Sequence, residues 1–247
     1  MIRSLSLEEY PELLKEIPEP PTQLRYEGRL PISGNKLLAI VGTRKYSQYG
    51  KETCEQLIAG LSGEPVTIVS GLALGMDSIA HRAALRAGLQ TIAIPGSGLS
   101  RKVIAPRSHV ILADEIIENG GGLMSEYDDE MTYPGTWIYP RRNRLMAGMC
   151  HATIVIEAQI RSGTLITSRL ATEYNREVGA VPGPTHSPTS EGPHMLIRLG
   201  AALIRDKNDI LELLGLKRKD EAPTLMDIED LTSEEKVFIK ILENPCS

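Results

Sequence analysis

Between residues 36 and 216, short apolar runs alternate with longer segments in which apolar positions recur every three or four residues. The short runs are rich in β-branched residues, which is typical of strands covered on both faces. The longer segments have the period of helices that pack on one face. We predict strands over 37–41, 66–70, 91–95, 122–125, 153–158, 178–181 and 201–204. We predict helices over 48–62, 76–87, 110–119, 139–150, 163–175, 194–199 and 209–214.

This strict alternation predicts the fold class α/β, with a Rossmann-like, doubly wound, mostly parallel sheet and helices on both faces over residues 35–216. Residues 1–34 are dotted with prolines and predict a short helix and an extended arm lying against this domain. Residues 217–247 contain a charged linker and one amphipathic helix, 234–243. Because a lone helix cannot bury its apolar face unaided, it either docks on the main domain or begins a small domain that this chain does not complete.

Small and hydroxyl-bearing residues follow the ends of several predicted strands. Gly42-Thr43-Arg44 and Ser70-Gly71 come directly after two of them, and Ser162-Gly163-Thr164 follows another after a few residues. The carboxyl ends of parallel strands share one edge of the sheet, and ligands bind along that edge. Ser162 is a good N-cap, which leaves the amides of Gly163 and Thr164 to face an anion. The sequence therefore predicts an anion site at this edge.

An arginine cluster opens one of the predicted helices. Arg141, Arg142 and Arg144 occupy three of four positions beside the aromatic residues Trp137 and Tyr139. Arginine pairs bidentately with phosphate, and aromatic faces stack on bases. Phosphate binding therefore explains the cluster better than a solvated helix start does.

Catalytic and cofactor motifs are scarce. Gly96-Ser97-Gly98 comes closest to a dinucleotide fingerprint, but Arg101 stands at the third glycine position, and no phosphate-binding lysine loop is present. No cofactor is therefore predicted. Asp77 and His81 lie four residues apart on a helix, yet a helix-start carboxylate and a packed histidine explain them better than an acid–base pair, because no partner nucleophile is apparent. Arg176 is expected to be a solvated helix charge.

Charge and cysteine content narrow the choice further. The net charge is −5, but the acidic excess lies at the two ends of the chain, so a basic patch can act locally in the middle. The three cysteines are widely spaced, without a CxxC pair, so neither a disulfide framework nor a metal site is indicated. No signal peptide or membrane-length apolar run is recognised, and a cytoplasmic protein is expected.

Several ordered motifs resemble those of the DNA-processing protein A (DprA/Smf) family. They are GTR at 42–44, SGLALGMDSIAHRAAL at 70–85, TIAIPGSGL at 91–99, YPRRNRLMAGM at 139–149, SGTLIT at 162–167, REVGAVPG at 176–183 and GPHMLIRLGA at 192–201. The resemblance covers about residues 20–215. One departure is Ala105-Pro106-Arg107-Ser108-His109, where the family usually has Tyr-Pro-x-x-Asn, and Arg107 is expected to supply the basic contact there.

This resemblance implies a non-enzymatic protein that binds and protects incoming single-stranded DNA and loads the RecA recombinase on it during natural transformation. It also implies a homodimer, with His194, Ile197 and Leu203 at the interface, and a winged-helix domain of which 217–247 would hold only the first helix. Together with the strand-end reasoning, it predicts DNA contacts at Gly42, Thr43, Arg44, Ser70, Gly71, Arg107, Arg141, Arg142, Arg144, Ser162, Gly163 and Thr164.

A second hypothesis is a nucleoside-monophosphate hydrolase of the lysine-decarboxylase-like (LOG) group, which shares this kind of sheet and phosphate edge. That group resembles the chain less, because its Pro-Gly-Gly-x-Gly-Thr-x-x-Glu motif corresponds here to a run that lacks the double glycine and has Thr167 in the position of the catalytic glutamate. Threonine cannot provide the carboxylate that glycosidic cleavage needs.

Overall fold

The structure is a computed structural model, and it describes residues 1–132 and 138–216. The chain divides into two compact units, Met1–Gly215 and Leu216–Ser247. All the described helices and strands lie in the first unit. The helix predicted over 234–243, Trp137 and the side chain of Tyr139 lie outside the described residues.

Nine strands form one sheet in the order β1-β2-β6-β5-β4-β3-β7-β8-β9. Their bounds are β1 (Arg3–Ser4), β2 (Arg25–Gly28), β3 (Lys36–Val41), β4 (Val66–Ser70), β5 (Thr91–Ala93), β6 (Gly122–Ser125), β7 (Ala152–Val155), β8 (Glu177–Ala180) and β9 (Ala202–Leu203). The seven strands from β6 to β9 along this order pair in parallel, whereas β1 pairs antiparallel with β2, and β2 antiparallel with β6.

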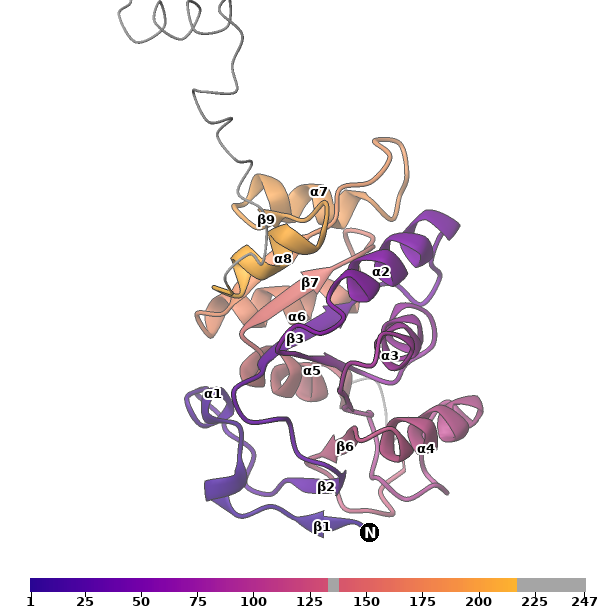
Figure 1. Cartoon of the computed structure of the whole chain (residues 1–247), viewed down its shortest axis with the longest axis vertical. Helices are drawn as coiled ribbons and strands as arrows, with labels where there is room; N and C mark the ends of the chain where they lie inside the picture. The colour runs from indigo at the N-terminus through magenta and orange to yellow at the C-terminus, as the bar shows by residue number, and fades with distance from the viewer. Residues whose placement is uncertain (133–137, 217–247) are drawn as a thin grey trace, which may run out of the picture. The chain divides into compact units, whose positions relative to one another are not determined.

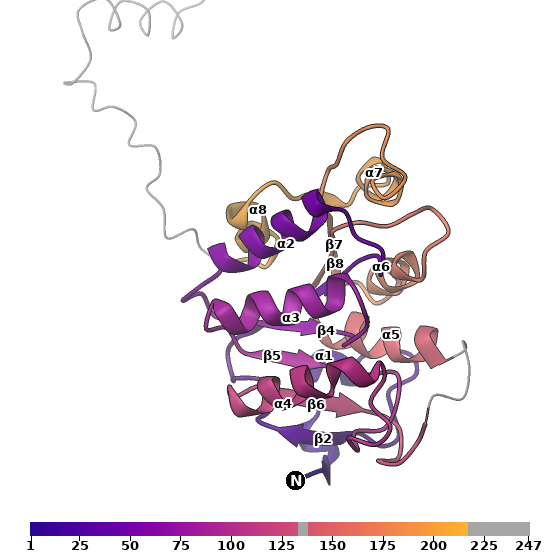
Figure 2. The same ribbon diagram turned by 90° about the vertical axis from the view of Figure 1, so that its right-hand side faces the viewer.

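Helices cover both faces of the sheet. Their bounds are α1 (Glu12–Lys15), α2 (Gln48–Gly60), α3 (Met76–Arg86), α4 (Val110–Glu118), α5 (Ile138–Met149), α6 (Gly163–Glu173), α7 (Glu191–Arg198) and α8 (Lys207–Leu213). Helices α2, α3 and α4 lie on one face, and α5 and α6 lie on the other (Figures 1 and 2). The predicted fold class is confirmed: the sheet is Rossmann-like and doubly wound.

The order of the strands creates a switch point between β3 and β7. From β3 the chain proceeds through β4 and β5 to β6 in one direction, then returns to the other side of β3 and proceeds through β7, β8 and β9. The loops that leave β3 and β7 therefore diverge to opposite faces, which opens a crevice at their carboxyl ends. The strand predicted over 153–158 ends at Val155. Beyond that point, the carbonyl oxygen of Glu157 accepts the amide of Thr43, and the amide of Ala158 donates to the carbonyl oxygen of Thr189.

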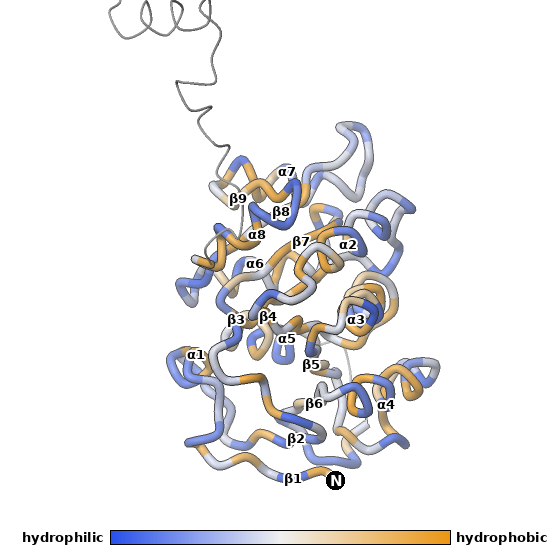
Figure 3. Tube along the Cα trace, in the orientation of Figure 1, coloured by the Kyte–Doolittle hydropathy of each residue, from blue (hydrophilic) through white to orange (hydrophobic). Residues whose placement is uncertain are grey.

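The middle strands are almost entirely buried. This burial on both faces explains their uninterrupted apolar runs. Hydrophobic and hydrophilic residues alternate along the helices that surround these strands (Figure 3). Among the described residues, no helix is both long enough and apolar enough to cross a bilayer.

Residues 1–34 are more integrated than an arm that lies against the domain. β1 and β2 extend the sheet, and the side chain of Tyr26 on β2 is fully buried. Arg176 secures the same segment: one of its guanidinium nitrogens donates to the carbonyl oxygen of Leu13 at 2.8 Å and pairs with Glu16 at 2.9 Å. The expectation of a solvated Arg176 was wrong, since its side chain is only 9% exposed.

Candidate nucleic-acid interface

A pocket of about 330 Å³ lies at the carboxyl edge of the sheet, at the switch point. It is bounded by the segments after β3 and β4 and by residues of α5 and α6. Its lining consists of Val41, Gly42, Thr43, Arg44, Ala73, Leu74, Asp77, Arg142, Asn143, Met146, Ser162, Gly163, Thr164 and Thr167. Among the predicted DNA contacts, the structure thus brings together Gly42, Thr43, Arg44, Arg142, Ser162, Gly163 and Thr164.

The loop after β3 forms one wall of this pocket and packs closely on the start of α3. A Cβ atom at Gly75 would lie 2.6 Å from Cα of Arg44, which is too close for a side chain. In addition, φ of Gly75 is +83°, a backbone conformation that favours glycine. The amide of Met76 donates to the carbonyl oxygen of Thr43 at 3.2 Å. The close contact presents the exposed side chain of Arg44 at the pocket.

Arg142 forms the inner wall. The residue is 5% exposed, and Nη1 of its guanidinium group donates to the carbonyl oxygens of Gly71, at 2.6 Å, and Ile94, at 2.7 Å. A Cβ at Gly71 would overlap this guanidinium group and lie 2.5 Å from Oδ2 of Asp77. Arg142 and Asp77 therefore meet in the space that a side chain at position 71 would need.

Asp77 lies in the first turn of α3, buried in the pocket wall. Burial raises the pKa of its carboxyl group, and the positive charge of Arg142 opposes that rise. His81 is buried without exposure, its Nδ1 lies 2.7 Å from Oγ1 of Thr91, and burial lowers its pKa to about 3. His81 is thus a packed histidine, as predicted, and burial keeps it neutral at physiological pH.

The N-terminus of α6 forms the opposite wall. Ser162 is its N-cap, as predicted, and its hydroxyl accepts the amide of Thr164 at 3.1 Å. The cap therefore engages one of the two amides that were predicted to face an anion. Asn143 on α5 donates to the carbonyl oxygen of Gly163 at 3.3 Å, which joins the starts of the two helices.

The side chains of the arginine cluster lie in different surroundings, and the DNA contacts expected of Arg141, Arg142 and Arg144 stay predictions. Arg141 is exposed, with Nε 3.5 Å from Oε1 of Glu126. Arg144 is buried, pairs with the same glutamate, and donates to the carbonyl oxygen of Glu19 at 2.6 Å. Consecutive helical positions face different directions, so only Arg142 of the three reaches the pocket.

The remaining predicted contacts lie outside the pocket lining. Ser70 is buried and donates its hydroxyl to the carbonyl oxygen of Ile40 at 2.7 Å, and Gly71 accepts from Arg142. Arg107 is exposed beside the start of α4 and donates to the carbonyl oxygen of Lys102 at 2.8 Å. Their roles in DNA binding stay predictions.

Glu157 was missed by the sequence reasoning. It follows β7 at the switch point, and its buried carboxylate accepts hydrogen bonds from Ser47 and Thr189. Its position at the end of a buried apolar run could have marked Glu157 in the sequence, because a buried carboxylate needs several hydrogen-bond donors around it. The partners themselves lie more than thirty residues away in either direction, so the sequence did not reveal them.

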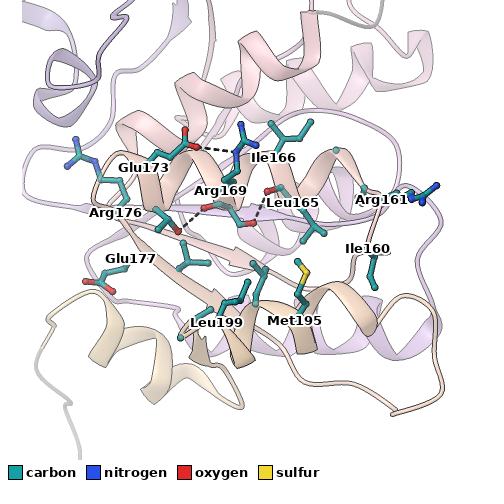
Figure 4. Close-up of a pocket in the computed structure, with 18 residues that line it drawn as sticks. Ile160, Arg161, Leu165, Ile166, Arg169, Glu173, Arg176, Glu177, Met195 and Leu199 are labelled. Atoms are coloured by element: carbon teal, nitrogen blue, oxygen red, sulfur yellow. Dashed lines mark hydrogen bonds and ion pairs between the residues drawn. The ribbon is translucent and has the colours of Figure 1, made fainter.

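A larger, mainly apolar cavity of about 1000 Å³ lies between α6 and α7 (Figure 4). Leu165 and Ile166 of α6 and Met195 and Leu199 of α7 are among its lining residues. The predicted interface residues lie close by but do not line it. Leu203 is exposed, Ile197 is half-buried, and Nε2 of His194 lies 3.0 Å from the carbonyl oxygen of Gly183.

The fold and the switch-point pocket define the class of this protein: a Rossmann-like α/β protein whose pocket at the carboxyl edge of the sheet is lined by arginines and by the N-terminus of a helix. A family model described as DNA recombination-mediator protein A matches residues 2–215. The chain belongs to this family, the DprA/Smf family.

Individual relatives agree with that assignment. Protein Smf of Escherichia coli (strain K12) is 43% identical over 216 residues, which make up 87% of this chain and 57% of that protein. The X-ray structure of DNA processing protein A from Streptococcus pneumoniae superposes with a TM-score of 0.79 at 40% identity, covering 85% of this chain and 74% of that one. A structure of DNA processing protein A from Helicobacter pylori, described for its single-stranded DNA binding mode, superposes with a TM-score of 0.76 at 28% identity, covering 86% and 95%.

Proposed function

We propose that this protein binds single-stranded DNA in the switch-point pocket, leaves it chemically unchanged, protects it and loads the RecA recombinase on it during natural transformation. Since the chain spans 57% of the length of the Escherichia coli relative, the activity of the whole protein is part of this proposal. A cytoplasmic location follows from the same role.

The observation that carries the proposal is the composition of the pocket. The exposed Arg44 and the capped start of α6 face a common space at the switch point. Guanidinium groups and helix N-termini both favour phosphate. No histidine or cysteine is among the lining residues, and the carboxylate of Asp77 is buried beside Arg142. This is a set of groups for holding a polyanion rather than for cleaving one.

The hydrolase alternative finds no support in the geometry. Thr167, which stands where the LOG group has its catalytic glutamate, lines the pocket but is buried and carries no acid. Incubation with nucleoside monophosphates is expected to release no base. Release of base would revive the enzymatic alternative and contradict the proposal.

Self-association is a further part of the proposal. Leu203 on β9 exposes an apolar side chain at the edge of the sheet, and edge strands tend to pair. We expect a homodimer that involves His194, Ile197 and Leu203. Sedimentation of the wild type and of a Leu203→Arg variant would test it, with a monomeric variant expected.

The main test is a salt titration of binding to single- and double-stranded oligonucleotides of equal length. Binding driven by phosphate contacts releases counterions, so the logarithm of the affinity is expected to fall linearly with the logarithm of salt concentration, with a slope of about −0.7 per phosphate for a single strand. We expect the single strand to bind more tightly at every salt concentration. Equal affinity for both forms, or no binding at low salt, would contradict the proposal.

A further inference from the structure

We propose that Glu157 is a positioning residue for the DNA pocket, which holds the loop 43–47 and with it Arg44 in place. The inference rests on the proposed function. Glu157 is not among the residues that line the pocket, so it acts through the loop rather than on DNA.

Glu157 binds both ends of this loop. At one end, its carbonyl oxygen accepts the amide of Thr43 at 2.8 Å. At the other end, its carboxylate accepts the amide of Ser47 at 2.9 Å through Oε2 and the hydroxyl of Ser47 at 2.7 Å through Oε1. A loop of five residues tied at both ends to one rigid strand terminus has little freedom to move Arg44.

The carboxylate occupies a site built for it. Glu157 is 3% exposed, and the hydroxyl of Thr189 adds a third hydrogen bond, at 2.7 Å to Oε1. A Cβ at Gly50 would overlap the carboxylate, so this glycine, in the first turn of α2, leaves the room that the charge needs. The N-terminus of α2 is also a favourable place for a negative charge.

The other side of the loop rests on α3. Gly75 packs against Cα of Arg44, and the amide of Met76 donates to Thr43. The loop is therefore held between α3 and Glu157. Displacement of the carboxylate would release one side only, so the fold can persist while the direction of Arg44 is lost.

Two variants disturb the carboxylate in different ways. Glu157→Gln keeps the shape but replaces one acceptor oxygen with an amide that cannot accept from Ser47. Gly50→Ala keeps the charge, suits a helix, and displaces the carboxylate sterically. We expect each to weaken affinity for a single-stranded oligonucleotide about fivefold to tenfold, within the range of one ordinary hydrogen bond. The matched control is Glu118→Gln, the same charge change at an exposed position on α4, where the affinity is expected to stay at the wild-type value.

A double-mutant cycle with Arg44→Ala separates positioning from general destabilisation. If Glu157 acts by placing Arg44, the double variant Arg44→Ala/Glu157→Gln binds within about twofold of Arg44→Ala alone, because both changes remove the same contact. The inference would be overturned if the affinity losses of Arg44→Ala and Glu157→Gln multiplied in the double variant. It would also be overturned if Glu157→Gln and Gly50→Ala both bound with wild-type affinity.

Hydrogen exchange gives a readout that does not depend on DNA. The amides of 43–47 are expected to exchange faster in Glu157→Gln, with those of α4 unchanged, and unchanged exchange in the loop would also overturn the inference. Should Glu157→Gln not fold, Gly50→Ala carries the test. A wild type that does not bind, or an Arg44→Ala variant that binds like wild type, would instead refute the proposed function and the inference together.

Discussion

Nη1 of Arg142 lies 2.6 Å from the carbonyl oxygen of Gly71, and this hydrogen bond joins the start of α5 to the end of β4. The same nitrogen binds the carbonyl oxygen of Ile94, just after β5. A single arginine therefore satisfies two strand-end carbonyl groups and forms the inner wall of the pocket. Its role is structural as well as electrostatic.

Arg142→Ala is expected to destabilise the protein by about 2–4 kcal/mol, because it leaves two carbonyl groups and the carboxylate of Asp77 without their buried partner. Urea denaturation measures this change. Arg82→Ala is a suitable control, since its guanidinium group makes an exposed ion pair with Glu115 and should cost less than about 1 kcal/mol. Similar stabilities for the two variants would show that the Arg142 bonds contribute little.

Gly71→Ala tests the close approach of Arg142 and Asp77. The added methyl group has no room, so either the two charged side chains separate or the strand end shifts, with an expected loss of about 1–3 kcal/mol. Gly163→Ala is the matched control, because a Cβ at that position meets nothing within 4 Å. Gly34→Ala is unsuitable, because φ of Gly34 is +87° and alanine would be strained there. Stability is expected to fall in the first variant and to stay within about 0.5 kcal/mol of wild type in the second.

Arg44→Ala tests the pocket with little effect on the fold. Because the side chain is exposed, we expect a change in stability within about 0.5 kcal/mol. Loss of one phosphate contact should reduce the salt slope by about 0.7 and weaken binding of single strands about tenfold at low salt. Fluorescence anisotropy across a salt series measures both quantities. An unchanged slope would mean that Arg44 does not contact phosphate.

Because burial lowers the pKa of His81, we expect the free energy of unfolding to depend on pH. Its pKa is about 3 in the folded protein, and about 6.5 is usual for an unfolded chain. Between these values the unfolded state binds the proton that the folded state refuses, so the stabilising contribution is complete above about pH 6.5 and declines as the pH falls towards 3. The slope from this group approaches about 1.4 kcal/mol per pH unit. Denaturation of wild type and His81→Gln from pH 7 to pH 4 is expected to show a shallower decline in the variant.

The order of the elements was accessible from the sequence because their hydrophobic periods differ. The runs 37–41, 66–70 and 122–125 correspond to strands within one residue, since strands that are buried on both faces have nearly continuous runs of apolar and small residues. The Ser162 cap and the positions of the strand-end turns follow from local chemistry in the same way. Boundaries were less accurate where tertiary contacts define them, and α7 begins at Glu191 rather than at residue 194.

The partners of the arginines could not be predicted. Arg141, Arg142 and Arg144 have the same chemistry in the sequence. In the fold, Arg142 binds the carbonyl oxygen of Gly71, whereas the exposed Arg141 and the buried Arg144 both pair with Glu126. Likewise, nothing local indicates that Glu157 binds Ser47, or that β2 joins β6. These are contacts between segments that lie far apart in the chain.

The amino-acid sequence by itself determined most helices and strands after residue 35, that the sheet is doubly wound, and that small and hydroxyl-bearing turns follow its strands. Period, capping and turn preferences act over a few neighbouring residues, which is why these features could be predicted. Only the tertiary structure decided which cations reach the pocket and which are buried in ion pairs. A charged side chain takes its role from the groups that surround it, and those groups come together only when the chain has folded.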